Sequence, residues 1–309
     1  MILVENLFNT LKKNKIDFFT GVPDSILKEF SSFLEKLTIK QHMIAVNEGS
    51  AASIGIGYYL STKKIPCIYL QNSGLSNAIN PLISIASKEV YSMPLLLMIG
   101  WRGSPKIKDE PQHMVKGKIT PKLLKLLKIE YCVLRDTKDL LKLSKLIKKA
   151  NKNKKIIACL VERDILKSNL LKKNYVSNKN SLLRGDFIEE FLKHIPLHSK
   201  IISTTGYSSR ELMQIRKGKK LIRGKDFYMV GGMGHSSMVA LGYTINSNNI
   251  VFCLDGDGSA LMHLGSLRTV GFSSSKKFKH ILFNNNSHES VGGQSTNAEG
   301  IDFKSLVKS

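Results

Sequence analysis

The sequence predicts an α/β protein of two domains, each a mostly parallel sheet flanked by helices. Apolar runs of strand length alternate with segments of helix length through most of the chain. Runs such as PLLLMIGW at 94–101 lack polar alternation, as expected of strands that are buried on both faces. The 309 residues also exceed one typical domain of about 150 residues, and the alternation is interrupted once. These observations favour two similar α/β units.

The first block of alternation runs to residue 164. We expect a helix over 2–14, and Pro23 followed by Asp24 signals the start of a helix over 23–37. The other helices of this block are expected at 47–61, 74–87, 120–129 and 137–150, and the strands at 17–22, 42–46, 65–71, 94–101, 131–135 and 155–162.

Residues 165–183 lose this periodicity and are rich in Lys, Asn and Ser. We therefore read 165–183 as a linker between a domain at 1–164 and a domain at 184–309. In the second block the helices are expected at 184–195, 208–215, 235–245 and 260–272, and the strands at 200–206, 226–231, 250–256 and 280–285.

The net charge of +23 comes mostly from lysines spread through the chain. A nucleic-acid binder usually gathers its basic residues on one face or interleaves them with aromatic residues. Here lysine alternates with Leu, Ile and Asn, and aromatic residues make up only 7% of the chain. The charge thus favours solvated helix faces, and a positive field would help to collect an anionic substrate. A basic nucleic-acid-binding protein stays as a remote alternative.

The sequence also indicates a cellular compartment. Its four cysteines lie far apart, in or beside apolar segments, without the spacing of a zinc or redox motif. Buried free thiols in a reducing compartment are therefore expected. The N-terminal segment lacks the layout of a signal peptide, and the longest apolar runs are too short to cross a bilayer. We expect a cytoplasmic protein without a membrane partner.

Two aspartates stand among glycines directly after an apolar run, in CLDGDGSALM at 253–262. Ligands of open α/β sheets collect at the carboxyl ends of strands. Asp257 stands at such an end, and Asn285 ends the next expected strand 28 residues later. Their oxygens suit Mg²⁺ or Ca²⁺, and the glycines let backbone N–H groups approach a phosphate. A plain turn followed by an Asn-rich loop is the alternative.

The pattern GDG, helix, strand, NN resembles the cofactor motif of thiamine-diphosphate-dependent decarboxylases. More narrowly, segments spread over residues 20–296 resemble the phosphonopyruvate decarboxylases, to which sulfopyruvate decarboxylases are close. These segments are TGVPDS (20–25), QNSGLSNAINPL (71–82), GWRG (100–103), DEPQH (109–113), TTGYSSREL (204–212), GDGSALMHLGSL (256–267) and NNNSHESVGGQST (284–296).

The resemblance implies a pyrimidine-binding domain at 1–164, a diphosphate-binding domain at 184–309, and the cofactors thiamine diphosphate and Mg²⁺. It implies a carboxy-lyase of phosphonate biosynthesis that converts 3-phosphonopyruvate to phosphonoacetaldehyde and CO₂. Sulfopyruvate, another small anionic 2-oxo acid, is the alternative substrate.

The resemblance also implies roles for residues of the second domain. Mg²⁺ would be bound by Asp257, Asn285 and the backbone carbonyl of Ser287, while Asp255 would order the loop. Met233 would hold the cofactor in a bent shape, or else fill the core. The full set expected to contact the cofactor is Glu48, Thr205, Gly206, Gly231, Met233, Gly256, Asp257, Gly258, Ser259 and Asn285.

Glu48, in VNEGSAA, matches the catalytic glutamate of the family. It would share a proton with the aminopyrimidine ring of the cofactor, which requires a pKa raised by burial. A carboxylate favoured by the helix dipole is the alternative. Because this glutamate reaches a cofactor bound by the partner subunit in the family, at least a homodimer with its active site between subunits is implied.

Further candidates would contact the substrate. Arg102 would bind its oxyanions through paired hydrogen bonds, or else form an ion pair with Asp109 or Glu110. His113 and His288 are candidate proton shuttles or structural histidines. Asp24 faces the substrate or caps its helix.

The sequence departs from the family pattern in two places. Asn286 stands where the family usually has glycine, and asparagine tolerates left-handed backbone geometry. The chain also stops soon after GGQST, whereas the family continues for several dozen residues. The second domain is thus expected to be truncated at its C-terminus, and a chain that binds cofactor without turnover is an alternative.

Overall fold

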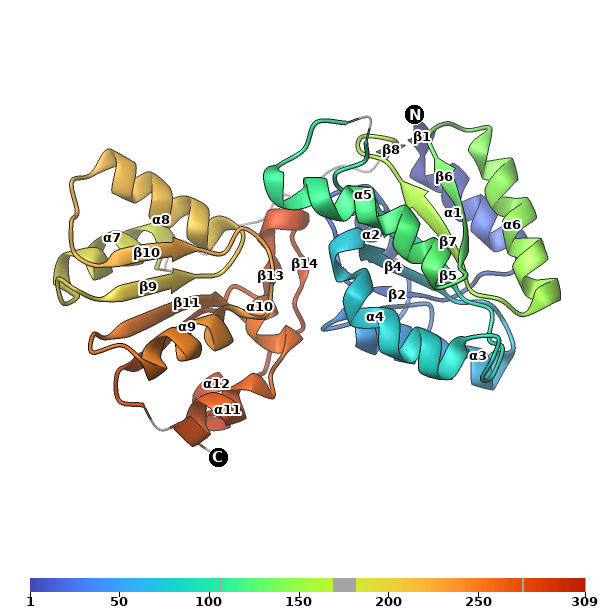
Figure 1. Ribbon diagram of the computed structural model, residues 1–309. Coiled ribbons are helices and arrows are strands. Elements are labelled where there is room, and N and C mark those ends of the chain that lie inside the picture. The colour runs from blue at the N-terminus through green and yellow to red at the C-terminus, as the bar shows by residue number, and fades with distance from the viewer. Residues whose placement is uncertain (106, 169–181, 274, 309) are drawn as a thin grey trace. The chain divides into compact units, whose positions relative to one another are not determined.

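The computed structural model describes residues 1–105, 107–168, 182–273 and 275–308. The chain divides into two compact units. Unit 1 comprises Met1–Leu171 and Val291–Gln294, and unit 2 comprises Lys172–Ser290 and Ser295–Ser309. In each unit helices surround a sheet (Figure 1). Residues 169–181 of the expected linker lie outside the described residues.

Unit 1 contains a six-stranded parallel sheet with the order β3-β2-β4-β5-β7-β6. Every residue of the central strands β5 and β7 is buried. This burial explains why their sequences lack polar alternation. The strands are β2 (Phe19–Gly21), β3 (His42–Ile44), β4 (Cys67–Gln71), β5 (Leu96–Gly100), β6 (Glu130–Leu134) and β7 (Ile157–Val161).

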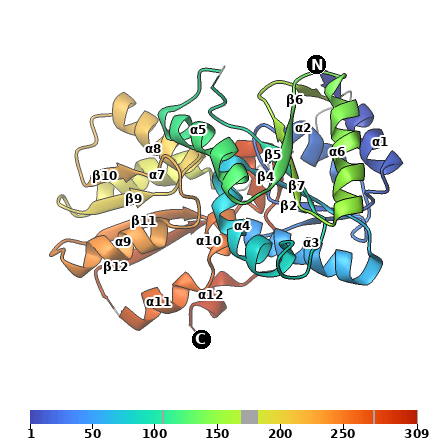
Figure 2. The same cartoon turned by 45° about the vertical axis from the view of Figure 1, so that its right-hand side comes forward.

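The helices of unit 1 cover both faces of this sheet (Figure 2). One core contains side chains of α1, α2 and α6 packed on Tyr69 and Met98, and the other contains side chains of α3, α4 and α5 packed on Leu70 and Leu97. Successive residues of β4 and β5 thus point to opposite faces. The elements are α1 (Val4–Lys13), α2 (Lys28–Leu34), α3 (Glu48–Thr62), η1 (Asn72–Gly74), α4 (Leu75–Pro81), η2 (Leu82–Ala86), α5 (Pro111–Leu126) and α6 (Asp139–Asn153).

Three element boundaries in unit 1 differ from the sequence-based expectation. Strand β1 (Ile2–Leu3) pairs with β8 (Leu166–Lys167), so two residues of the expected linker belong to a small parallel sheet. Helix α2 begins at Lys28 rather than at residue 23, because Asp24 accepts hydrogen bonds from the N–H groups of residues 26 and 27 and holds a non-helical turn. Helix α5 begins earlier than expected, with Pro111 in its first turn.

Unit 2 contains a four-stranded parallel sheet with the order β10-β9-β11-β12. Side chains of α7 and α8 pack on Ile201 and Leu254, and α9 packs on the opposite face, on Ile202 and Cys253. The strands are β9 (Lys200–Ser203), β10 (Lys225–Tyr228), β11 (Val251–Gly256), β12 (Phe278–Phe283), β13 (Ser287–His288) and β14 (Gln294–Ser295). The helices are α7 (Arg184–His194), α8 (Tyr207–Gly218), α9 (Ser236–Ile245), α10 (Asp257–Met262), α11 (Ser266–Ser273), η3 (Glu289–Val291) and α12 (Phe303–Leu306).

The single helix expected over 260–272 is therefore two helices, α10 and α11. The four cysteines are free, and all but the half-buried Cys132 are buried, as expected. Within the part of the chain that the structure describes, no helix is both long enough and apolar enough to span a bilayer.

Candidate cofactor and active site

The GDG turn and the Asn-rich loop follow neighbouring strand ends in unit 2. β11 pairs with β12 in a register that places Gly256 beside Phe283. Asp257, only 3% exposed, begins α10, and the Thr296 hydroxyl donates a hydrogen bond of 2.5 Å to its Oδ2. Burial raises the pKa of Asp257. This edge thus holds a buried carboxylate whose negative charge a bound cation would stabilise.

The loop after β12 presents further oxygens. The Ser287 N–H donates to Asn285 Oδ1 at 3.1 Å, and Asn285 Nδ2 donates to Glu289 Oε2 at 3.3 Å. Asn286 has a φ of 55°, so the left-handed geometry expected of this position is present without a glycine. Asn285, Ser287 and Asp257 line one cavity, and they offer amide, carbonyl and carboxylate oxygens, the ligand types that suit Mg²⁺.

Most of the residues of unit 2 predicted to contact the cofactor, bind the metal or move a proton line this same cavity. They are Thr205, Met233, Gly256, Asp257, Gly258, Ser259, Asn285, Ser287 and His288. Gly206 and Gly231 are not among its lining residues. Gly206 instead adopts a φ of 96° where β9 turns into α8, a conformation that favours glycine.

The two glycines of GDG have different surroundings. A Cβ on Gly256 would meet no atom within 4 Å, so its backbone is open to an approaching phosphate. A Cβ on Gly258 would lie 2.8 Å from His288 Cε1 and 2.9 Å from a methyl carbon of Thr296. One glycine leaves space for a ligand, and the other lets two side chains pack. The open backbone and the oxygen donors fit a magnesium diphosphate.

Two polar side chains hold the turn in place. Ser259 Oγ accepts a hydrogen bond from the Gly234 N–H at 3.1 Å and lies 3.1 Å from Thr204 Oγ1, which joins the GDG turn to two other turns of the site. Asp255 accepts from the Gly256 N–H at 3.0 Å and pairs with His280 Nε2 at 3.2 Å. Asp255 is buried, which opposes ionisation, yet the hydrogen bond and charge of His280 contribute to lowering its pKa. Asp255 thus orders the loop, as expected.

His288 lies in the cavity, and burial lowers its pKa to about 4. Its imidazole is therefore neutral near pH 7 and able to accept a proton. The sequence-based prediction missed Arg184, Tyr207, Glu289 and Thr296, which line the same cavity. Glu289 and Thr296 stand inside the motif at 284–296 and could have been found there, whereas Arg184 carries no sequence signal.

In unit 1, Glu48 is the first residue of α3 and is only 5% exposed. Asn77 Nδ2 donates to Glu48 Oε2 at 2.8 Å. A Cβ on Gly74 would lie 1.8 Å from Glu48 Oε1, so any larger residue at this position would displace the Glu48 side chain. Burial raises the pKa of Glu48 despite the Asn77 hydrogen bond, as expected of an acid that must share a proton.

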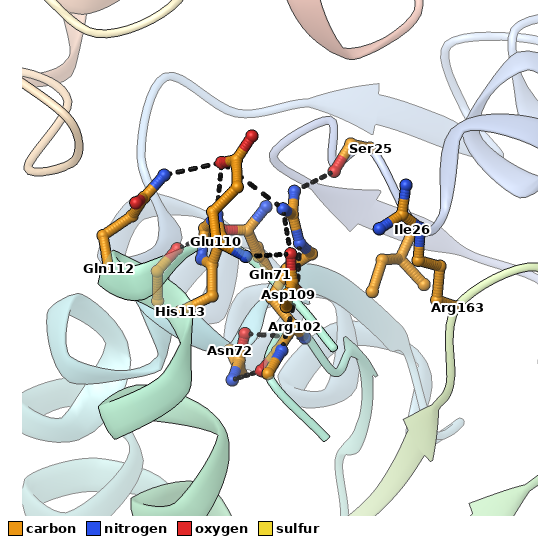
Figure 3. Close-up of polar contacts among 12 residues, drawn as sticks. Ser25, Ile26, Gln71, Asn72, Arg102, Asp109, Glu110, Gln112, His113 and Arg163 are labelled. Atoms are coloured by element: carbon orange, nitrogen blue, oxygen red, sulfur yellow. Dashed lines mark hydrogen bonds and ion pairs between the residues drawn. The ribbon is translucent and has the colours of Figure 1, made fainter. Parts of the chain in front are cut away.

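Arg102 lies in the ion pair that was the alternative to substrate binding (Figure 3). Its Nε and Nη2 donate to the two carboxylate oxygens of Asp109 at 2.8 and 2.6 Å, and its Nη1 donates to Ser25 Oγ at 3.1 Å. The Arg102 and Asp109 side chains are only 15% and 3% exposed, so this ion pair is buried rather than superficial. The guanidinium holds the pKa of Asp109 well below its usual range.

Asp24 lies beside this ion pair and is fully buried. Its Oδ2 accepts hydrogen bonds from the N–H groups of residues 26 and 27, and its Oδ1 accepts one of 2.6 Å from Gln71 Nε2. Asp24 therefore orders the turn before α2 but does not cap the helix, because Leu27 is the N-cap residue and no side chain caps it. The other candidate, His113, has its Nε2 3.7 Å from Glu110 Oε2. Its buried Nδ1 has no hydrogen-bond partner among the described residues. Burial also lowers the pKa of His113.

Lys116 was missed in the sequence. It follows His113 by three residues on α5, which places the two on one face of the helix. Its charge acts on both Glu48 and His113 and lowers the pKa of each. Among the described residues, no carboxylate lies within ion-pairing distance of Lys116. Its lysine-rich surroundings gave no reason to select it.

Comparison with known proteins agrees with this arrangement. Residues 1–126 match the model "Thiamine pyrophosphate enzyme, N-terminal TPP binding domain", and residues 204–308 match the corresponding C-terminal TPP binding domain. The chain is 32% identical to a phosphonopyruvate decarboxylase from Streptomyces viridochromogenes, over 93% of this chain and 74% of that protein. It is 30% identical to a phosphonopyruvate decarboxylase from Streptomyces hygroscopicus, over 99% of this chain and 79% of that protein. The chain belongs to the phosphonopyruvate decarboxylase family of thiamine pyrophosphate enzymes.

Sulfopyruvate decarboxylase is also a relative. Its beta and alpha subunits from Methanocaldococcus jannaschii are 35% and 34% identical to this chain, over 37% and 40% of it, and the matches cover 57% and 70% of those subunits. The range matched by the N-terminal model includes Glu48, and the range matched by the C-terminal model includes Asp257. The chain is thus a thiamine pyrophosphate enzyme. Thiamine diphosphate is therefore its cofactor, and the family typically uses it with Mg²⁺.

Proposed function

We propose that this chain catalyses the thiamine-diphosphate- and Mg²⁺-dependent decarboxylation of 3-phosphonopyruvate to phosphonoacetaldehyde and CO₂. The observation that carries the proposal is the similarity to two phosphonopyruvate decarboxylases over 93% and 99% of the chain. The buried Glu48 carboxyl and the oxygen donors near Asp257 support it, because this chemistry needs a proton-sharing acid and a bound metal diphosphate.

When bound, thiamine diphosphate supplies an acceptor for the electrons released as CO₂ leaves. Glu48 would hold a proton at a ring nitrogen of the cofactor, and its pKa, raised by burial, favours its protonated form. Asp257, Asn285 and the Ser287 carbonyl would hold Mg²⁺. The open backbone at Gly256 would receive the diphosphate.

The substrate carries two anionic groups, which need cationic or N–H donors. We propose Lys116 as one donor, because its ammonium group has no described carboxylate partner while the Arg102 guanidinium is held by Asp109. Arg102 and Asp24 then act by fixing the segments around the substrate. His113 and His288 stay our candidates for moving a proton, and burial lowers the pKa of each.

Sulfopyruvate is the second candidate substrate. A phosphonate and a sulfonate are both tetrahedral anions of similar size, and the similarity to sulfopyruvate decarboxylase subunits favours this alternative. We further propose that copies of the chain associate, with the active site between subunits, and that the protein acts in the cytoplasm. The separate subunits of the sulfopyruvate relatives support an oligomeric assembly.

The test combines calorimetry with product assays. The full chain is titrated with thiamine diphosphate in the presence of Mg²⁺, and aldehyde and CO₂ formation are followed with phosphonopyruvate and with sulfopyruvate. A higher kcat/KM for phosphonopyruvate is expected, and the reverse order would favour the alternative substrate.

Two other results would each replace the proposal. Saturable cofactor binding without product from either acid would identify a cofactor-binding chain without turnover. Salt-sensitive nucleic-acid binding without cofactor binding would identify a basic nucleic-acid binder.

A further inference from the structure

One carboxylate oxygen near the metal site accepts hydrogen bonds from two sides. Glu289 Oε2 accepts from Asn285 Nδ2 at 3.3 Å and from Arg184 Nη2 at 3.1 Å. Arg184 also donates to both carboxylate oxygens of Glu211, at 3.0 and 2.7 Å. We call Arg184, Glu211 and Glu289 the Arg184 clamp. Arg184 and Glu289 line the same cavity as Asn285 and Asp257.

The chemistry of the two groups fixes which end of the Asn285 amide faces Glu289. An amide offers an N–H₂ donor at one end and an oxygen acceptor at the other, whereas a carboxylate only accepts. Glu289 can therefore face only the nitrogen of Asn285. The oxygen then points the other way, where it accepts a hydrogen bond from the Ser287 N–H. Since Mg²⁺ binds oxygen, this is the amide orientation that a metal ligand needs.

Arg184 holds Glu289 in this position. Its side chain is 17% exposed and lies between two carboxylates, while the Glu289 side chain is 51% exposed. Burial opposes its charge, but the two glutamates keep the pKa of Arg184 above its ordinary value. The guanidinium also lies 5.9 Å from the centre of the Tyr207 ring. Without Arg184, a half-exposed glutamate would have several rotamers, and its hold on Asn285 would weaken.

We propose that Glu289, held by Arg184, is a positioning residue that fixes the Asn285 amide and thereby sets the affinity of the site for Mg²⁺. This inference rests on the proposed role of Asn285 as a metal ligand. Replacing partners that orient metal ligands typically weakens metal binding by about 10- to 100-fold.

The experiment measures thiamine diphosphate binding to the full chain by calorimetry at a series of Mg²⁺ concentrations. In Glu289→Gln the new amide can either donate or accept, so residue 289 no longer excludes the flipped Asn285 amide, and only the Ser287 N–H opposes it. We expect the Mg²⁺ concentration for half-maximal cofactor binding to rise about tenfold or more in this variant and in Glu289→Ala. Glu211→Gln should cause a smaller rise, because Arg184 keeps its contact with Glu289.

Glu299→Gln is the matched control, since this exposed glutamate lies outside the cavity and should leave the Mg²⁺ requirement unchanged. Melting temperatures verify that each variant folds. If both Glu289 variants need no more than twice the wild-type Mg²⁺ concentration, the clamp has no positioning role. If the wild type binds cofactor and the Glu289 variants weaken it, but no product forms, the inference holds and the proposed activity fails. A wild-type chain that binds no thiamine diphosphate overturns both.

Discussion

Two buried carboxylates of unit 1, Glu48 and Asp109, lie in opposite electrostatic environments. Asp109 accepts two hydrogen bonds from the Arg102 guanidinium and others from backbone N–H groups, and its pKa is lowered. Glu48 accepts one hydrogen bond from a side-chain amide, and burial raises its pKa. The first arrangement stabilises a permanent charge and fixes geometry. The second leaves an acid able to exchange a proton.

A single turn connects the two environments. Asn72 Nδ2 donates to the Arg102 carbonyl at 2.9 Å, and Asn72 Oδ1 accepts from the Arg102 N–H at 3.1 Å. Two residues later, Gly74 lies against the Glu48 carboxyl. The Arg102 backbone is therefore joined to the turn that lies against Glu48. Substitutions in the two environments should have different effects. A substitution at Glu48 should mainly reduce activity, and one at Arg102 should mainly reduce stability.

The largest effect is expected for Glu48→Gln. Removing the proton-sharing acid should lower kcat by about 10²- to 10⁴-fold, the usual contribution of general acid–base catalysis. Cofactor affinity should stay near wild type, because glutamine can still accept a hydrogen bond from Asn77. Product formation and calorimetry measure the two effects, and Glu89→Gln, on a side chain 63% exposed, is the control. A variant with full activity would rule out the proposed role of Glu48.

Arg102→Gln should mainly destabilise the fold. It leaves the 3% exposed Asp109 side chain without its ion pair, a loss that typically costs about 3 kcal/mol. The measurement is the free energy of unfolding in denaturant. In Arg102→Gln/Asp109→Asn both charges are absent, so part of the stability should return. If instead the single variant keeps wild-type stability and only raises KM, Arg102 binds substrate.

Asp257→Asn extends the comparison to unit 2, where another buried carboxyl has a raised pKa. This residue is proposed to bind a cation directly, so removal of its charge should weaken Mg²⁺-dependent cofactor binding by at least about tenfold. Calorimetry at several Mg²⁺ concentrations measures the change. Asp186→Asn, on an exposed residue of α7, should behave like wild type. An unchanged Mg²⁺ requirement in Asp257→Asn would remove this residue from the metal site.

The smallest effect is a dependence of stability on pH. The pKa of Glu48 is raised in the folded state, so as the pH rises this carboxyl ionises first in the unfolded chain. Glu48 therefore lowers the stability of the fold at pH values above about 4.3, the ordinary pKa of a glutamate. Glu48→Gln should therefore gain stability relative to wild type as the pH rises from 4 to 7. Denaturant unfolding at both pH values tests this. A constant difference would show that ionisation is not its cause.

Local patterns in the sequence were sufficient to predict the sheets and much of the site. Buried parallel strands give continuous apolar runs, and ligand-binding residues follow their carboxyl ends, so Asp257 and Asn285 could be placed at adjacent strand ends. The burial of Glu48 was expected from the proton-sharing role that the family resemblance implied. The left-handed conformation of Asn286 followed from its replacing glycine.

Contacts that depend on tertiary structure were not predictable in the same way. Arg184 comes close to Asn285 only because α7 packs beside the end of β12, and no local pattern reports that approach. The pairing of Arg102 with Asp109 was foreseen as an alternative, but its burial depends on the surrounding fold. The late start of α2 results from the side chain of Asp24 competing for backbone N–H groups, which is stronger here than helix propensity.

The close approach of Gly74 to Glu48 means that the residue at one position limits the residue that the other, 26 residues away in the sequence, can hold. With 1.8 Å between Glu48 Oε1 and a Cβ at position 74, no side chain larger than hydrogen can coexist with the acid in this conformation. A chain with a smaller residue in place of Glu48 lacks that constraint, so position 74 can then hold a larger residue. Related chains that have the activity proposed here are therefore expected to combine glutamate at position 48 with glycine at position 74.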